Sequence, residues 1–280
     1  MASAPGSLAS LDGEIMLASE ATIPATDEGL IRGDGVFEVM RVYAGRPFAL
    51  DRHLARLDRS ARNLRLEVDL EAIRADIWRL LAQAGSGPDQ DLLRVVVTRG
   101  GRRLLLTEPL PAIPSTVRLG SVTYSPTRVL DGVKSLSYGA NMLASRLARE
   151  GGFDEALLVT PHGRVLEAPT SSIFWVKNGE LLTPPLDEHI LASITRAIVI
   201  AGTGAAERSC TFDELLEADE AFLASTAREV HPISAIDERT FDAPGSVTAR
   251  TAEIVAGLVR QQLEDETGPA ESLPLDADTR

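Results

Sequence analysis

The order of the predicted strands is the feature that most constrains the fold of this chain. Segments rich in Val, Ile and Leu follow one another with short turns between them, at Glu155–Thr160, Arg164–Glu167, Ser172–Val176 and Glu180–Thr183. Such runs, bounded by turn residues, are typical of β-strands. A doubly wound parallel sheet would need a helix after nearly every strand, so the pattern disfavours it. We therefore expect an α+β protein.

The predicted elements fall into two halves. In the first half, a strand over Gly35–Tyr43 is followed by two segments that carry apolar residues at helical spacing. We expect an N-terminal domain over residues 1–124, a linker over 125–133 and a C-terminal domain over 134–264. Residues 265–280 are polar, acidic and contain proline, so we expect a disordered tail there.

The composition excludes several classes of protein. Of the 280 residues, 44% are apolar, which is enough for a sizeable core and too many for a disordered chain. The 28 basic and 41 acidic residues give a net charge of −13. Because nucleic-acid binding needs a basic surface that displaces counterions, we expect no nucleic-acid partner. A small anion can still be bound by a locally basic site.

Metal and membrane functions also lack support in the sequence. The single cysteine, Cys210, excludes an intramolecular disulfide and a thiolate cluster. The four histidines show no metal-ligand spacing. The chain has no apolar stretch of about 18 residues, and its first residues lack a signal-peptide pattern. We expect no metal, no membrane partner and a cytoplasmic location.

Chemistry that needs a nucleophilic amine has two candidate residues, because the chain contains only two lysines. Lys177 lies in Val-Lys-Asn-Gly, which is typical of a hairpin turn. Lys134 lies among small and apolar neighbours, with Asp131 as the only other charge nearby, and the pKa of such a lysine can fall. The usual motifs of serine hydrolases, zinc proteases, P-loop proteins and dinucleotide-binding proteins are absent.

Six segments, in consistent order from Leu11 to Asp237, resemble the class IV aminotransferases, which are fold-type IV enzymes that use pyridoxal 5′-phosphate (PLP). They are D-E-G-L-I-R-G-D-G-V-F-E-V-M-R-V-Y at 27–43, H-L-A-R-L at 53–57, V-K-S-L-S at 133–137, D-E-A-L-L-V-T with V-L-E-A-P-T-S-S-I-F-W-V at 154–176, L-L-T-P-P-L with I-L-A-S-I-T-R at 181–196, and D-E-A-F-L-A-S-T-A-R-E-V at 219–230. The resemblance implies a two-domain fold, with a smaller N-terminal α/β domain and a larger, β-rich, pseudo-barrel C-terminal domain. It also implies a homodimer.

The resemblance assigns roles to particular residues. Lys134 matches the lysine that binds the aldehyde carbon of PLP and later moves the substrate proton. Glu167 matches the glutamate that pairs with the pyridine nitrogen and keeps it protonated. Arg56 matches the phosphate-binding arginine, whose planar guanidinium can donate two hydrogen bonds. Further cofactor contacts are implied at Tyr138, Leu191, Ile194, Thr195 and Thr226.

Three reactions compete within the family. The segments E-V-M-R-V-Y and A-S-T-A-R-E-V resemble the D-amino-acid transaminases, which favours transfer of an amino group from a D-amino acid, or an (R)-amine, to a 2-oxo acid. The alternatives are 4-amino-4-deoxychorismate lyase and the branched-chain L-amino-acid aminotransferase. The Arg-Asn-His cluster that binds the substrate carboxylate in D-amino-acid transaminases has no match here. Candidate carboxylate contacts are therefore Arg32, Arg99, Arg102 and Arg103. Phe37 and Val39 are further candidate substrate contacts.

Overall fold

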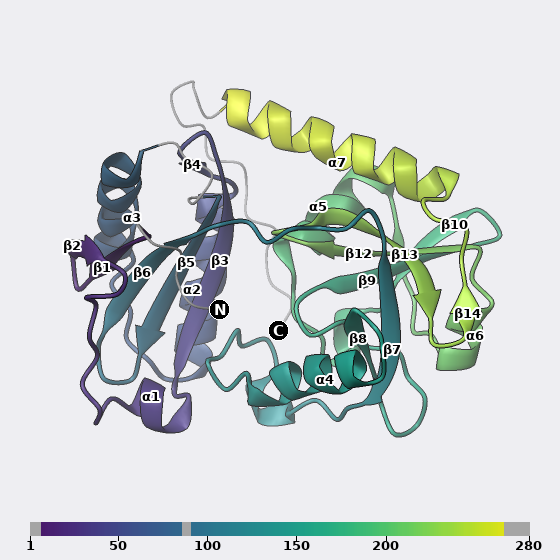
Figure 1. Cartoon of the computed structure of the whole chain (residues 1–280), viewed down its shortest axis with the longest axis horizontal. Helices are drawn as coiled ribbons and strands as arrows, with labels where there is room; N and C mark the ends of the chain where they lie inside the picture. Colours follow the sequence, from purple (N-terminus) through teal and green to yellow (C-terminus); the bar gives the residue numbers. More distant parts are fainter. Residues whose placement is uncertain (1–6, 86–90, 266–280) are drawn as a thin grey trace.

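The computed structural model describes residues 7–85 and 91–265, and within them the chain forms two sheets with helices packed against them (Figure 1). The α+β class predicted from the sequence is confirmed. The first sheet has six strands in the order β2-β1-β6-β5-β3-β4. Its strands are β1 (Leu8–Leu11), β2 (Glu14–Leu17), β3 (Gly35–Tyr43), β4 (Arg46–Pro47), β5 (Leu92–Thr98) and β6 (Arg103–Glu108).

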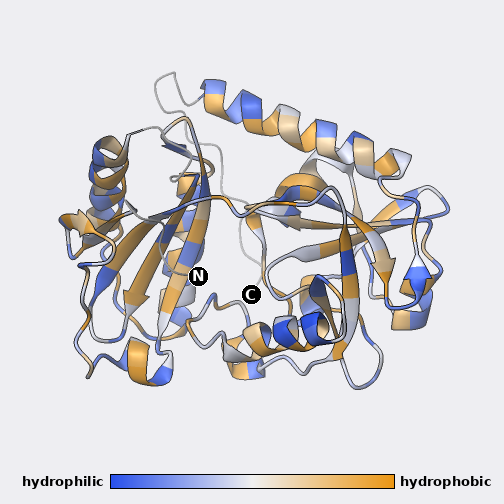
Figure 2. Ribbon diagram, in the orientation of Figure 1, coloured by the Kyte–Doolittle hydropathy of each residue, from blue (hydrophilic) through white to orange (hydrophobic). Residues whose placement is uncertain are grey.

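Strand alternation gives β3 two different faces. On this strand, Val36 and Met40 are fully buried in a core that they share with α2 and α3. Phe37 and Val39 lie on the opposite face because successive side chains of a strand alternate. The helices of this half are α1 (Glu28–Arg32), α2 (Leu50–Asn63) and α3 (Leu70–Ala84). Figure 2 shows apolar residues concentrated on the strands of both sheets.

The second sheet has its strands in the order β11-β10-β9-β12-β13-β7-β8, with β14 paired to β13. These strands are β7 (Val117–Thr123), β8 (Glu155–Val159), β9 (Ser172–Lys177), β10 (Glu180–Thr183), β11 (Ala206–Glu207), β12 (Glu220–Ser225), β13 (Glu229–Ile236) and β14 (Arg239–Thr240). The accompanying helices are η2 (Arg128–Leu130), α4 (Gly139–Glu150), η3 (Leu186–Glu188), α5 (Ile194–Thr203), α6 (Phe212–Leu216) and α7 (Ser246–Asp265). No helix among the described residues is both long and apolar enough to cross a membrane.

The division between the sheets lies earlier than the expected linker over 125–133. Strand β7 pairs with β8 and β13, so it belongs to the second sheet although it precedes residue 124. The segment around Lys134 returns to the first half and runs along the edge of β3. There the Phe37 N–H donates to the Lys134 carbonyl at 3.0 Å, and the Leu136 N–H donates to the Gly35 carbonyl at 2.9 Å. The backbone of Lys134 is therefore fixed by the N-terminal sheet.

Three further points concern what the sequence predicts. Arg164–Glu167 does not form a regular strand, although isolated bridges and backbone hydrogen bonds to Leu158 join it to β8. The short β1–β2 hairpin was not predicted from the sequence. The expected tail over 265–280 lies outside the described residues except for Asp265, which is the last residue of α7.

Candidate active site

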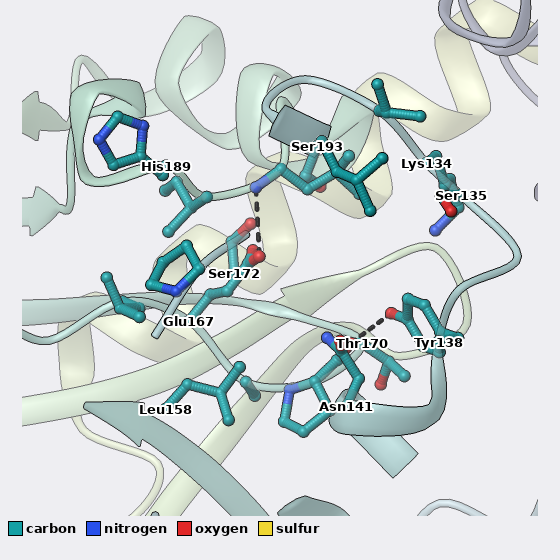
Figure 3. Close-up of a pocket in the computed structure, with 18 of the residues that line it drawn as sticks. Lys134, Ser135, Tyr138, Asn141, Leu158, Glu167, Thr170, Ser172, His189 and Ser193 are labelled. Atoms are coloured by element: carbon teal, nitrogen blue, oxygen red, sulfur yellow. Dashed lines mark hydrogen bonds between the residues drawn. The ribbon is translucent and has the colours of Figure 1, made fainter. Parts of the chain in front are cut away.

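A pocket opens between the two halves, at the point where the segment after η2 meets the loops of the second sheet. It is lined by residues from α2, the segment 130–141, the loop 166–172, the loop 189–193 and the turn after β12. Figure 3 shows Lys134, Glu167 and Tyr138 among these lining residues. Arg56, Leu191 and Thr226 line the same pocket. Six residues that are far apart in the sequence and that the resemblance singles out are thus brought together: Arg56, Lys134, Tyr138, Glu167, Leu191 and Thr226.

Lys134 presents its amine next to aromatic rings. Its Nζ atom lies 4.3 Å from the ring centroid of Phe37 and 5.9 Å from that of Tyr138. Its backbone N–H donates to the Ser60 hydroxyl at 3.1 Å. Burial, together with the positive charge of Arg56, lowers the pKa of Lys134 to about 8. Near pH 8, the neutral amine is therefore a larger fraction of Lys134 than it is of an ordinary lysine, whose pKa is about 10.4.

Glu167 provides a carboxylate in the same pocket. It lies in the loop between β8 and β9 and accepts a hydrogen bond from the Leu191 N–H at 3.1 Å (Figure 3). Burial raises the pKa of Glu167 to about 7, although this hydrogen bond and the charge of Lys134 act in the opposite direction. A cationic N–H group beside such a carboxylate stabilises its ionised form. A protonated pyridine ring would supply such an N–H group.

The N-terminus of α5 and Arg56 form an anion site beside this pocket. The Ser193 side chain caps α5 by accepting from the Arg196 N–H at 3.2 Å. The preceding N–H groups, of Ile194 and Thr195, have no hydrogen-bond partner among the described residues. Such groups at a helix start favour a phosphate. Both residues line a small second cavity, which shares Ser225 and Thr226 with the main pocket.

Tyr138 and Phe37 form an aromatic contact beside Lys134. Their ring centroids are 5.4 Å apart and their planes are nearly perpendicular. The Tyr138 hydroxyl donates to the Pro169 carbonyl, so an oxygen lone pair is left to accept from a ligand. Val39 lies on the same face of β3 as Phe37 and is half-buried. Neither Phe37 nor Val39 is among the lining residues of the pocket.

The structure does not bring the four predicted carboxylate-binding arginines to the pocket. Each pairs with an acidic side chain elsewhere, because the turn at 99–103 lies at the end of the first sheet and α1 is exposed. The Arg99 and Arg102 side chains approach Asp34 and Asp12 at 3.0 and 2.7 Å. The four ion pairs are Arg32–Glu28, Arg99–Asp34, Arg102–Asp12 and Arg103–Asp76.

Sequence reasoning missed Arg94, which lies in the middle of β5. It pairs in register with Val39 and therefore shares the face of Phe37 and Val39. Its guanidinium carbon lies 5.8 Å from the Phe37 ring centroid. The Arg94 charge also acts to lower the pKa of Lys134. The signal in the sequence was a single arginine inside the apolar run Leu-Leu-Arg-Val-Val-Val.

Comparisons with known proteins agree with this geometry. The family model described as amino-transferase class IV matches residues 35–236. A putative branched-chain-amino-acid aminotransferase of Methanocaldococcus jannaschii is 34% identical over 87% of this chain and 93% of its own length. A D-alanine aminotransferase of Bacillus licheniformis is 31% identical over 85% of this chain and 92% of its own.

A solved structure of an aminotransferase is also similar to this chain. The branched-chain amino acid aminotransferase of Thermobaculum terrenum, in its PLP form, matches with a TM-score of 0.78 and 27% identity. The match covers 91% of this chain and 94% of that one. That structure is the holo-form of its enzyme, so a relative of this fold has been seen with the cofactor bound.

Proposed function

The chain belongs to the class IV aminotransferases and uses pyridoxal 5′-phosphate, and from this premise we propose that it transfers an amino group from a D-amino acid to a 2-oxo acid. The residues of the pocket and of the adjoining second cavity fit the cofactor. An amine at Lys134, a carboxylate at Glu167 and unpaired N–H groups at Ile194 and Thr195 match its aldehyde, ring nitrogen and phosphate.

One observation carries the choice of a D-amino acid. The two segments that resemble D-amino-acid transaminases, Glu38–Tyr43 and Ser225–Val230, meet across the gap between the halves. The Arg41 Nη1 donates to the Ala227 carbonyl at 2.9 Å, and the Tyr43 hydroxyl donates to Glu229 at 2.5 Å. The two segments are therefore in contact, and Tyr43, Thr226 and Glu229 line the small second cavity beside the main pocket, which supports reading the two segments as a single specificity element.

In the proposed reaction, the chain's own residues position groups and move one proton. The cofactor, when bound, supplies the electron sink that stabilises negative charge at the substrate Cα. Lys134 takes the Cα proton with its neutral amine, whose availability rises because of its lowered pKa. Glu167 keeps the ring nitrogen protonated by accepting its hydrogen bond. Arg56 and the N-terminus of α5 fix the phosphate.

Arg94 supports recognition of the substrate carboxylate in this proposal. It does not line the pocket itself, but its guanidinium carbon lies 5.8 Å from the centroid of the Phe37 ring that the Lys134 amine also approaches. Glu108 holds its Nε and Nη2 atoms at 2.6 and 2.9 Å, which leaves the Nη1 edge for another anion. An anchor that already has one carboxylate partner binds a second more weakly, so (R)-amines without a carboxylate are expected as further donors.

A homodimer is part of the proposal. Leu30 and Ile31 on α1 are 67% and 56% exposed, and Leu143 and Leu147 on α4 are 50% and 46% exposed. Helices α1 and α4 lie along the same side of the molecule (Figure 1). Exposed apolar side chains on both of these helices support an interface between two copies. Light scattering of the eluted protein should give twice the 30.0 kDa chain mass.

The experiment that tests the function offers four donors to the holoenzyme: D-alanine, L-leucine, (R)-1-phenylethylamine and aminodeoxychorismate. With 2-oxoglutarate as acceptor, D-alanine should yield pyruvate together with glutamate, and the (R)-amine should react more slowly. Activity confined to L-leucine would favour the branched-chain enzyme. Release of pyruvate and 4-aminobenzoate from aminodeoxychorismate, without amino transfer, would favour the lyase.

A further inference from the structure

A buried glutamate stands directly behind the arginine of the anion site. Glu38 is fully buried on the inward face of β3, between Val36 and Met40, where an apolar residue would be expected. Both of its oxygens accept hydrogen bonds from Arg56, Oε1 from Nε and Oε2 from Nη2, each at 2.7 Å. His53 is a further partner, with its Nδ1 atom 2.8 Å from Oε2.

The charges of this cluster follow from its contacts. Burial would raise the pKa of Glu38, but Arg56 and His53 lower it to about 2, so Glu38 is a carboxylate at neutral pH. Burial lowers the pKa of His53, which keeps the imidazole neutral. Because a carboxylate can only accept, the proton of the neutral imidazole lies on Nδ1 and is donated to Glu38. The cluster is thus a bidentate ion pair between Glu38 and Arg56, with a further hydrogen bond from His53 to Glu38.

The ion pair determines which donors of Arg56 remain for a ligand. A guanidinium has five N–H bonds. Glu38 takes one on Nε and one on Nη2, and the Ala192 carbonyl takes one on Nη1 at 3.1 Å. The remaining two N–H bonds have no partner within the described part of the chain, and Arg56 lines the pocket. Ala192 directly precedes the cap of α5, so this contact brings Arg56 to the start of that helix.

We propose that Glu38 is a positioning residue for the cofactor phosphate, because it holds one edge of Arg56 and directs the two remaining N–H bonds toward the anion at the N-terminus of α5. The inference rests on the proposed role of Arg56 in holding that phosphate. Glu38 lines neither the main pocket nor the small second cavity, so the proposal gives it no contact with cofactor or substrate. It acts through the orientation of Arg56, and His53 in turn holds the Glu38 carboxylate in place.

The sign of the effect separates positioning from simple charge balance. Glu38 is negative, so by Coulomb attraction alone its neutralisation would strengthen the binding of a phosphate at Arg56. If Glu38 positions Arg56, neutralising the Glu38 carboxylate weakens phosphate binding, because the guanidinium is no longer held by a bidentate ion pair. The two explanations therefore predict opposite changes in phosphate affinity for Glu38→Gln.

The test compares the dissociation constants of PLP and pyridoxal for the apoenzyme, followed by absorbance titration. Pyridoxal has the same aldehyde and ring but no phosphate, so the ratio of the two constants isolates the phosphate contribution. We expect the preference for PLP to fall about tenfold or more in Glu38→Gln, while pyridoxal binding changes little. Glu38→Asp should show a similar fall, because it keeps the charge but shortens the side chain. Arg56→Met is the reference that removes the anchor.

The outcomes distinguish the proposals from each other. If Arg56→Met lowers the preference for PLP but neither Glu38 variant does, the positioning role is wrong and the role of Arg56 survives. If Arg56→Met leaves the preference unchanged, the phosphate role of Arg56 fails and the role of Glu38 fails with it. A preference that rises in Glu38→Gln would also overturn the inference. Equal losses of PLP and pyridoxal binding would mean that Glu38 acts only on the fold, and this would overturn the inference. If Glu38→Gln does not fold, the same comparison is made with Glu38→Asp.

Discussion

Lys134 and Phe37 are joined twice, once through their backbones and once through their side chains. The Phe37 N–H donates to the Lys134 carbonyl at 3.0 Å, and the Lys134 Nζ lies 4.3 Å from the Phe37 ring centroid. The backbone contact ties the lysine to β3 of the six-stranded sheet, while Glu167 lies in the loop between β8 and β9 of the other sheet. The amine and the carboxylate are therefore held by different halves of the molecule.

Lys134→Ala should abolish amino transfer while the fold persists. The side chain is the proposed proton carrier, so turnover should fall by about a thousandfold or more. The thermal midpoint of the apoenzyme should change little, because the Lys134 backbone contacts remain. The matched control is Lys177→Ala, since Lys177 pairs with Glu217 at an exposed position. Normal turnover in Lys134→Ala would refute the assignment and direct attention to Lys177.

Glu167→Gln should slow the reaction without preventing cofactor binding. An amide cannot stabilise a protonated ring nitrogen as a carboxylate does, so the single-turnover rate with D-alanine should fall about a hundredfold. Stopped-flow absorbance measures that rate. Glu180→Gln, on the exposed start of β10, is a control that should react as the wild type does. An unchanged rate in Glu167→Gln would make Glu167 a structural acid only.

The amine of the apoenzyme should titrate well below the pKa of an ordinary lysine. The pKa of Lys134 is lowered to about 8, so the reactive neutral form grows as the pH rises through about 8. The rate at which the apoenzyme reacts with pyridoxal should therefore rise between pH 7 and 9 and level off above that, with a midpoint about two pH units below that of a free lysine. A rate that is still rising steeply at pH 10 would contradict a lowered pKa.

Arg94→Ala should weaken the use of D-amino acids more than the use of (R)-amines. Loss of a charge-assisted hydrogen bond to the carboxylate should lower kcat/KM for D-alanine by about tenfold to a hundredfold. The value for (R)-1-phenylethylamine should stay near that of the wild type. Arg102→Ala is the control, because its guanidinium pairs with Asp12 away from the pocket. Equal losses of kcat/KM for both donors would mean that Arg94 does not bind the substrate carboxylate.

The stability of the apoenzyme should fall below pH 6.5 because of His53. Its folded-state pKa is lowered, so the unfolded chain binds a proton more readily than the folded chain. Stability due to the neutral imidazole is thus present above about pH 6.5 and is lost as the pH falls below it. Urea unfolding at pH 7.5 and 5.5 measures this loss, which should be smaller in His53→Gln. An equal loss in both proteins would assign it to other groups.

The family was predictable from the sequence because its motifs are local. Each segment, such as V-K-S-L-S around Lys134, is read from neighbouring residues, and six of them in order indicated the class that the family match confirms. The run of strands likewise predicted the α+β class, because strand periodicity is a property of short segments.

Features that depend on long-range partners were not predictable in this way. Strand β7 joins the second sheet because it pairs with β8 and β13, and nothing in its own residues specifies those partners. Arg99 and Arg103 looked like free cations in the sequence, but Asp34 and Asp76 reach them from distant elements. Arg94 was missed because its place on the Phe37 face depends on its register with β3.

The most direct test of the central claim follows the α-hydrogen of alanine by proton NMR in deuterium oxide. If Lys134 takes the Cα proton of a D-amino acid, the holoenzyme with pyruvate present should exchange the α-hydrogen of D-alanine for deuterium and leave that of L-alanine in place. Lys134→Ala should exchange neither. Exchange of L-alanine alone, or undiminished exchange of D-alanine in Lys134→Ala, would contradict the account.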